Sequence, residues 1–200
     1  MLECYCCVFY QTFAQGGIMI IEGKRVILRA IENKDLALLQ NWSNNPEIQY
    51  GLGGWHFPSS MDIMNRWFES IQGDELNQRY AIDTEKHGLI GTANLVNINW
   101  KDRNAFTGML IGDKDIRGQG YGTDSVMTLM RYTFEELGLE RLDGSMIENN
   151  KASLKLYLGK CGWTEEGRKK NWYWRQNRYW DKIVVGITRE DYFDLVNESC

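Results

Sequence analysis

The sequence lacks several features that would assign its class at once. It has only 2 prolines among 200 residues, no run near the ~20 apolar residues of a membrane span, and no excess of Lys and Arg, because its formal net charge is −4. The missing span argues against a membrane partner, and the missing basic excess argues against a nucleic-acid partner. With 43% hydrophobic and 25% charged residues, the chain is also unlike a disordered or low-complexity segment.

Histidine and cysteine give no sign of a metal site. The two histidines, His56 and His87, stand apart, and three of the 5 cysteines are crowded together as Cys4, Cys6 and Cys7 with no matching cluster later in the chain. This spacing does not fit a structural zinc site, so no metal is expected. Scattered reduced thiols indicate the cytosol, so we expect a cytoplasmic protein.

The first eighteen residues differ from the rest of the chain. They show no clear period, contain no Lys or Arg, and carry Glu3 where a secretory signal would be basic. From Met19 the pattern becomes that of a strand leading into a helix. We therefore expect residues 1–18 to be an N-terminal extension outside the core and residues 19–196 to form a single domain; a dimerisation or redox arm is the alternative for the extension.

Residues beyond the extension alternate between strand-like and helix-like segments. Period-two patterns rich in β-branched residues predict strands, and apolar residues three and four apart predict amphipathic helices. Asn33 and either Ser59 or Ser60 are candidate helix caps, and Gly138 is a helix stop. Strands outnumber helices in a mixed order, which indicates the α+β (mixed α/β) class. The expected strands are Arg25–Ile31, Arg79–Asp83, Leu89–Trp100, Ala105–Ile111, Arg141–Ile147, Thr164–Trp174 and Arg178–Thr188; the helices are Asn33–Trp42, Lys151–Lys160, one after Ser60 and one after Gly120.

A glycine-rich string, RGQGYG at residues 117–122, is the most informative motif. It lies between the strand that ends at Ile111 and the helix that starts near Gly120. Glycines let the backbone turn tightly, and the unpaired amides at a helix start form a phosphate site. The string is neither a Rossmann fingerprint, which needs glycine where Thr123 stands, nor a Walker loop, which needs Gly-Lys-Ser/Thr. A helix cap without a ligand is the alternative.

A second group of polar residues follows about thirty positions later. Asn150, Ser153 and Tyr157 stand at i, i+3 and i+7, so they share one face of the predicted helix. A solvated surface is the alternative for these three residues alone. Together with the glycine turn and the strand between them, they form a far more specific combination.

This combination resembles the GNAT superfamily of acetyl-CoA-dependent N-acetyltransferases. The family signature Arg/Gln-x-x-Gly-x-Gly/Ala is matched within residues 117–122, and the later block by Asn150, Tyr157 and Gly162-Trp163. The surrounding IGDKDIRGQGYG and NNKASLKLYLGKCGWTEEGR, with the opening RVILRAIENKDL, are similar to the ribosomal-protein-alanine (RimJ/RimL-like) branch. The resemblance covers about residues 19–190.

The resemblance implies both a fold and an activity. The fold is a strongly twisted, mainly antiparallel seven-stranded sheet with helices on both faces, whose fourth and fifth strands splay apart to receive pantetheine. The co-substrate is acetyl-CoA, and a primary amine attacks it directly in a ternary complex without a covalent enzyme intermediate. The acceptor is a small molecule or a protein N-terminus, and a homodimer is left open because related chains are often dimers.

The resemblance also implies residue roles. Tyr157 is the expected catalytic acid, which protonates the departing CoA thiolate. Amides of the glycine turn hold the pyrophosphate, the strand end at residues 109–111 offers main-chain groups to pantetheine, and Asn150 bonds the pantetheine amides. The expected cofactor-binding residues are Met109, Leu110, Ile111, Arg117, Gly118, Gln119, Gly120, Tyr121, Gly122, Asn150 and Ser153.

The general base is not evident in the sequence. Where the superfamily often carries Glu, this chain has Phe106 and Ser145, with Asp143 and Glu148 as nearby substitutes. A lysine-like amine is neutral about once in two thousand at pH 7, whereas an α-amine is neutral about once in ten. The missing carboxylates therefore favour a peptide N-terminus or an amino sugar as acceptor. Polyamines, aminoglycosides, nucleotide-linked amino sugars and a non-catalytic acyl-CoA sensor are the alternatives.

Two aromatic segments are candidates for the acceptor site. Asn171–Trp174 and Tyr179-Trp180, bracketed by Arg175 and Arg178, suit stacking on a planar or sugar group beside a cation; packing across a hairpin or a dimer contact is the alternative. Residues 53–57 form either a covering loop or a core plug.

Three reactive side chains receive lesser roles. His56, in the loop at residues 53–57, is a candidate base, and His87 is expected to be solvated in a hairpin turn. Cys161 is expected to face the core or the helix end rather than act as a nucleophile.

Overall fold

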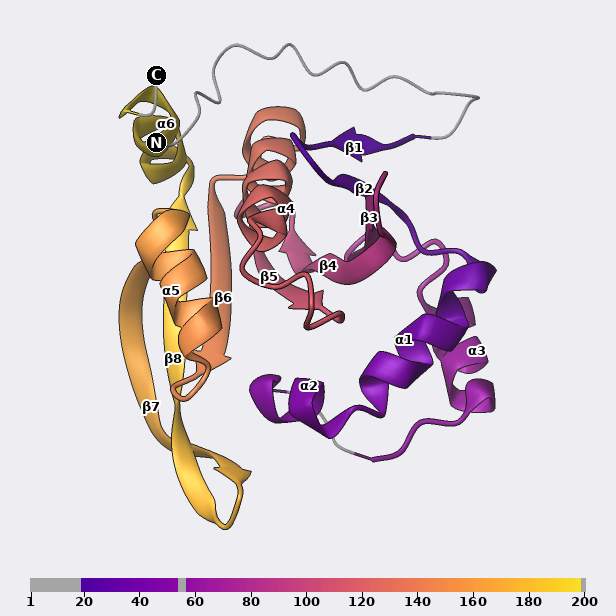
Figure 1. The fold of residues 1–200 in the computed structure, drawn as a ribbon. Coiled ribbons are helices and arrows are strands. Elements are labelled where there is room, and N and C mark those ends of the chain that lie inside the picture. Colours follow the sequence, from indigo (N-terminus) through magenta and orange to yellow (C-terminus); the bar gives the residue numbers. More distant parts are fainter. Residues whose placement is uncertain (1–18, 54–56, 199–200) are drawn as a thin grey trace.

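One sheet of eight strands organises the computed structural model, which describes residues 19–53 and 57–198 (Figure 1). The strand order is β1-β2-β3-β4-β5-β6-β8-β7, and every neighbouring pair is antiparallel except β5 and β6. The strands are β1 (Ile21–Glu22), β2 (Ile27–Ala30), β3 (Gln78–Thr84), β4 (Gly88–Asn99), β5 (Asn104–Ile111), β6 (Arg141–Ile147), β7 (Thr164–Arg175) and β8 (Arg178–Thr188).

Helices cover both faces of this sheet. They are η1 (Asn33–Asp35), α1 (Leu36–Ser43), α2 (Pro46–Gly51), α3 (Met61–Ser70), α4 (Tyr121–Arg131), the π-helical turn η2 (Tyr132–Glu136), α5 (Lys151–Lys160) and α6 (Arg189–Glu198). The α+β class and the mainly antiparallel sheet are confirmed. The count is eight strands rather than seven, because Ile21 and Glu22 pair with Leu28 and Ile27 in a hairpin ahead of the first predicted strand.

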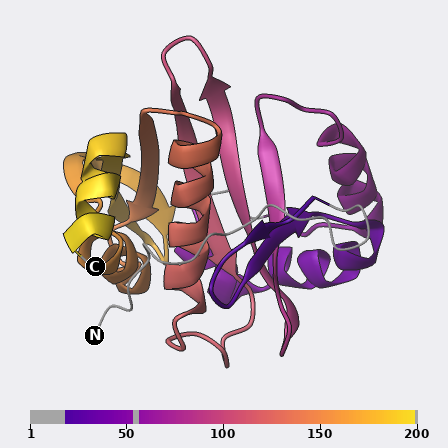
Figure 2. The same cartoon turned by 90° about the horizontal axis from the view of Figure 1, so that it is seen from above.

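Side chains of adjacent strand residues divide into two cores, one on each face. On β3, Ala81 packs with the apolar sides of α1–α3, whereas its neighbour Ile82 packs with α4. On β5, Leu110 likewise faces the core formed with α1–α3, while Met109 and Ile111 face the core that contains α4. Successive strand residues point to opposite faces, so α1–α3 occupy one face and α4–α6 the other (Figure 2).

Helix starts agree only partly with the predicted caps. Ser60 caps α3, since its hydroxyl accepts a hydrogen bond from the Ile63 amide at 3.3 Å. The prediction that Asn33 caps the first helix is wrong, because Asn33 lies inside η1 and Glu32 holds the cap position. Asp35, placed three residues after Glu32, accepts the Glu32 amide at 2.8 Å. A capping pair therefore replaces the single Asn cap, a shift of one residue that spacing alone does not resolve.

The start of α4 is fixed to the β1–β2 hairpin by a buried carboxylate. Asp124 is 4% exposed and accepts three backbone amides, those of Lys24 at 3.1 Å, Arg25 at 2.6 Å and Val26 at 3.0 Å. An ionised acceptor in the first turn also complements the positive end of the helix dipole. This contact joins residues about a hundred positions apart and sets where the glycine turn lies.

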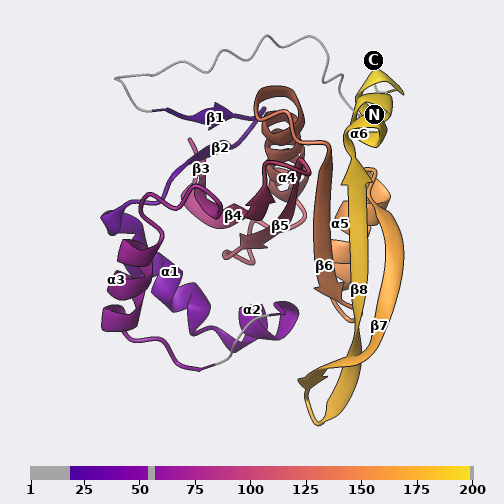
Figure 3. The ribbon, with the colours of Figure 1, turned by 180° about the vertical axis from the view of Figure 1, so that it is seen from behind.

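The parallel pair in the middle of the sheet is short. β5 pairs with β6 only from Asn104–Phe106 to Arg141–Asp143, and beyond this point the strands separate. β5 stays paired with β4 as far as Ile111, and β6 with β8 as far as Ile147. The predicted splayed strands are therefore present, and one edge of β5 is left without a strand partner after Phe106 (Figure 3).

Two predicted features fall outside what the structure describes. Residues 1–18, the predicted extension, and His56 with its neighbours in 54–56 are not among the described residues. No helix in 19–53 or 57–198 combines the length and apolar character that crossing a membrane requires.

Replacing Asp124 with alanine tests its role in placing α4. The change leaves three amides without their acceptor, so the free energy of unfolding should fall by about 3 kcal/mol. Urea denaturation followed by circular dichroism measures this loss. Asp115→Ala, an exposed carboxylate just before the glycine turn, is the matched control and should change stability by less than about 0.5 kcal/mol; equal stability of the two variants would remove Asp124 from this role.

Candidate active site

The glycine turn before α4 presents backbone amides that the protein does not use. Gly118 and Gly120 have φ angles of 79° and 93°, the left-handed region that favours glycine. No side chain caps α4, and within the described chain no hydrogen bond is donated by the amides of residues 118–122. Because free amides at a helix start attract anions, this turn retains the capacity for phosphate that its sequence predicts.

Two arginines brace the turn from outside. The Arg25 guanidinium donates to the Gln119 carbonyl and lies 4.4 Å from the ring centre of Tyr121. Arg117 donates to the carbonyl of Ile111, the last residue of β5, at 3.0 Å. Tyr121 is buried, and its ring meets the exposed His87 edge-on at 5.6 Å. Side chains of this string therefore shape the turn, while its backbone faces outward; His87 lies in its hairpin turn but is not merely solvated.

The predicted pantetheine strand lies at the free edge of β5. Met109, Leu110 and Ile111 are all half-buried and pair with β4 on one side only. Past Phe106, the main-chain groups on the other side meet no strand. Such an edge offers ladder hydrogen bonds to an extended ligand.

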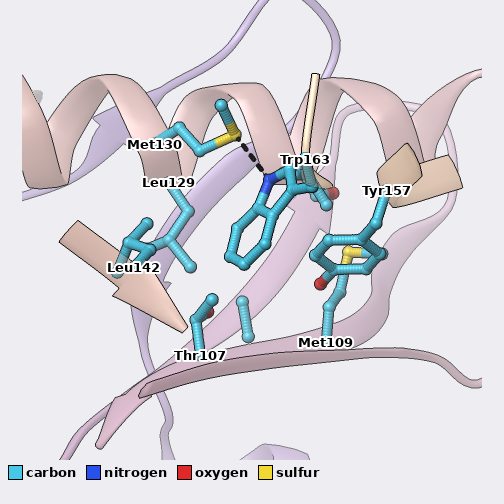
Figure 4. Close-up of a pocket in the computed structure, with 10 residues that line it drawn as sticks. Thr107, Met109, Leu129, Met130, Leu142, Tyr157 and Trp163 are labelled. Carbon is cyan, nitrogen blue, oxygen red and sulfur yellow. Dashed lines mark hydrogen bonds between the residues drawn. The ribbon is translucent and has the colours of Figure 1, made fainter. Parts of the chain in front are cut away.

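Tyr157 reaches this edge from α5. It lines a cavity of about 10 Å³, enough for about one water molecule, together with Thr107 and Met109 of β5 and residues of α4. Figure 4 shows the phenol directed toward Thr107 and Met109. No described residue is hydrogen-bonded to the hydroxyl, so the hydroxyl is free to donate its proton. Burial raises the pKa of the phenol above the ordinary tyrosine value, and Cys161 adds to the shift.

Trp163 holds Tyr157 in place. Its ring meets that of Tyr157 edge-on at 5.0 Å, and its indole N–H donates to the Met130 sulfur at 3.3 Å (Figure 4). A Cβ at Gly144 of β6 would lie 3.3 Å from the indole. Trp163, from the Gly162-Trp163 pair of the sequence motif, thus packs between β6 and α4 at the end of α5, beside the point where the sheet opens.

Asn150 and Ser153 lie at the start of α5, on the other side of the opening. The Asn150 side-chain oxygen accepts the Ser153 amide at 3.1 Å, and its amide group donates to the Gly51 carbonyl at 2.9 Å. Asn150 therefore caps α5 and ties it to the end of α2. Its predicted contact with pantetheine stays a prediction, and it would have to share these two bonds.

Neither substitute for the general base has a free carboxylate. Asp143 accepts Arg141 at 2.7 Å, and Glu148 accepts Arg168 at 2.9 Å and the Asp181 amide at 3.2 Å. Phe106 of β5 and Ser145 of β6, the positions predicted to correspond to the family's Glu, carry no carboxylate. Burial raises the pKa of the Tyr173 phenol, with Ser145 opposing the shift, and this phenol lies 2.8 Å from where a Cβ of Gly53 would be.

The two aromatic segments meet where the Tyr173 phenol lies beside Gly53. Trp174 and Tyr179 pack across the β7–β8 hairpin at 4.8 Å, as the alternative interpretation has it, and Arg178 stacks on Trp180 at 3.3 Å. Phe57 is 69% exposed, which excludes it as a core plug.

Several residues that shape the site were missed in the sequence. Asp124 accepts the amide of Arg25, and the Arg25 guanidinium donates to the Gln119 carbonyl of the turn, across 99 and 94 residues of sequence. Their only sequence signal was placement, Asp124 in the first turn of a helix that begins at a glycine turn. Tertiary pairing, which no local pattern contains, brings them together.

A turn with unbonded amides at a helix start, an unpaired strand edge and a buried phenol thus border the opening in the sheet. Residues 25–164 match the family model described as "Acetyltransferase (GNAT) domain", and the chain belongs to this family.

Characterised and uncharacterised relatives agree with this assignment. The chain is 26% identical over 171 residues to the SPbeta prophage-derived uncharacterized N-acetyltransferase YokL of Bacillus subtilis, covering 85% of this chain and 93% of that one. It is 25% identical over 172 residues to the spermidine N(1)-acetyltransferase of Vibrio cholerae, covering 85% and 96%. The crystal structure of spermidine N-acetyltransferase from Vibrio cholerae in complex with CoA and spermine superposes with a TM-score of 0.78 at 25% identity, covering 84% and 98%. The protein is therefore an acyltransferase, while a RimJ/RimL-like branch is not what these relatives indicate.

Cys161 is expected to be chemically inert. It is fully buried at the end of α5, and burial raises the pKa of its thiol to about 12, so almost none is thiolate at pH 8. In the native protein, iodoacetamide at pH 8 should leave the Cys161 peptide unmodified by mass spectrometry. In urea the same peptide should react, which is the internal control. Rapid native labelling with loss of activity would instead indicate a nucleophile.

Proposed function

We propose that this protein transfers the acetyl group of acetyl-CoA to a primary amine by direct attack in a ternary complex. The observation that carries the proposal is the alignment of three unused polar features along one opening: the amides of residues 118–122, the edge of β5, and the Tyr157 hydroxyl. The crystal structure of the Vibrio cholerae relative holds CoA, which supports the same co-substrate here.

Each feature has one task in the reaction. The turn amides bind the diphosphate and Arg117 keeps the turn against the end of β5. Main-chain groups of residues 109–111 align the pantetheine arm, and one N–H there polarises the thioester carbonyl as charge develops on its oxygen. When the carbon–sulfur bond breaks, the Tyr157 hydroxyl gives its proton to the departing thiolate, and the proton that the attacking nitrogen loses passes to water, from which the phenol is reprotonated. The Met109 side chain lines the small cavity at Tyr157, so it moves aside to admit the thioester.

The acceptor we propose is an amine of low pKa, either an α-amine of a peptide or an amino sugar. Asp143 and Glu148 are both held by arginines, which leaves no free carboxylate among them to deprotonate a lysine-like ammonium. An amine that is already partly neutral at pH 7 does not need that step.

A polyamine is the second candidate, favoured by the activity named for the Vibrio cholerae relative. A non-catalytic acyl-CoA sensor is the third, favoured by the missing base. A thiol-release assay with acetyl-CoA and a panel of peptides, amino sugars and polyamines separates the three. We expect release with α-amines or amino sugars; release with spermidine alone supports the second candidate, and thermal stabilisation by acetyl-CoA without release from any acceptor supports the third.

Replacing Tyr157 with phenylalanine tests the proton donor. The ring and its packing against Trp163 remain, so the Kd for acetyl-CoA should change less than about twofold, while kcat falls by roughly 10²-fold or more. Because burial raises the pKa of the phenol, the acid stays protonated as pH rises, and the wild-type rate should show no descending limb below about pH 10. Tyr50→Phe, an exposed tyrosine at the end of α2, is the control. A Tyr157→Phe rate equal to wild type from pH 6 to 9 would contradict the role.

A further inference from the structure

Because β5 and β6 stop pairing after Phe106, the gap between them borders both faces of the sheet, and we call its side on the face covered by α1–α3 the second mouth. Side chains of Thr107 and Met109 point to the Tyr157 face, and those of Phe106 and Leu110 point to the opposite face. The attacking amine must approach the thioester from a side that the CoA arm does not fill. Phe106, the last β5 residue paired with β6, marks this second mouth.

Two lysines stand beside Phe106 on that face. The Lys182 ammonium lies 6.0 Å from the ring centre of Phe106 and 5.3 Å from that of Trp172, and the Lys169 ammonium lies 4.9 Å from Trp172. The Trp172 side chain is 52% exposed. Its indole ring therefore lies beside two ammonium groups, those of Lys182 and Lys169. Cations beside an aromatic face form a surface on which an anion and a sugar or peptide plane can both be held.

These lysines form an uncompensated pair of like charges. Lys169 and Lys182 are direct cross-strand partners on β7 and β8, an arrangement that is destabilising for like charges. Neither forms an ion pair with any described residue. Burial lowers the pKa of Lys182, and the charge of Lys169 adds to that shift. A bound anion would relieve this repulsion.

The carboxylates on the same face are already neutralised. Asp143 and Glu166 both pair with Arg141, which lies over Gly186 of β8. A polyamine carries several ammonium groups and would meet the two lysines with neither of these carboxylates available to it. The charge at this mouth therefore opposes a polycation and favours an anion.

We propose that the acceptor carries a phosphate or carboxylate close to its amine, and that Lys182 and Lys169 bind this group at the second mouth. This inference rests on the proposed function, because it names the acceptor of that reaction. It assigns the two lysines to specificity, as residues that touch the acceptor away from the reacting atoms.

Binding to the CoA-loaded protein tests the anion site without requiring turnover. Isothermal titration with glucosamine 6-phosphate against glucosamine, and with a Ser-Asp amide against a Ser-Lys amide, compares matched ligands and separates phosphate from carboxylate. We expect at least one anionic ligand to bind about tenfold more tightly than its partner, with spermidine weakest. Equal affinities within both pairs, or tightest binding of spermidine, would overturn the proposal.

Charge variants locate the effect. Lys182→Gln and Lys169→Gln should each reduce the preference for the anion about tenfold, and because each removes a like-charge repulsion, circular dichroism should show them folded. Lys170→Gln is the matched control, since Lys170 acts on Asp181, on the opposite face of β8 from Lys182, and it should leave the preference unchanged. A preference untouched by both test variants would contradict the assignment. Tight binding of an anionic amine without thiol release would instead overturn the acetyl-transfer function and leave the anion site standing.

Discussion

The separation of β5 from β6 is the constraint on which the site depends. Three residue pairs hold the strands together, and each strand then follows its other neighbour, β4 or β8. Backbone groups at a sheet edge must find partners or face water. The unpaired edge of β5 can therefore form main-chain hydrogen bonds with an extended ligand. Trp163, seated on Gly144 and bonded to Met130, fills the space behind the opening with a rigid ring instead of a strand.

The glycine turn and Tyr157 border this opening because separate contacts bring them there. Asp124 places the start of α4 through three amides of the β1–β2 hairpin, and Arg117 ties the turn to the end of β5. Tyr157 arrives from the other side on α5, held by Trp163. An acetyltransferase domain of this kind thus assembles its site from two helices that meet across a gap in one sheet.

Much of this arrangement could be predicted from the sequence. The parts that were not predicted have physical explanations. Most strand and helix positions follow from local periodicity, and the amides of residues 118–122 follow from glycines at a helix start, whereas the short helices α2 and α6 were not predicted. The extra strand β1 is only two residues long and carries too little pattern to be seen. The cap at Glu32 and the Arg141–Asp143 pair are local contacts that periodicity does not resolve, whereas the arginine partner of Glu148 and the Lys169–Lys182 pair depend on register between segments. Local sequence contains no information on such register until the fold is known.

The central claim, that the turn amides bind the diphosphate of CoA, is tested most directly by amide chemical shifts. In a ¹H–¹⁵N titration of the labelled protein with CoA, the account predicts that the largest shifts occur at the amides of Gly118, Gly120 and Gly122, saturating together. Phosphate binding that shifts other amides and leaves these three unchanged would contradict it.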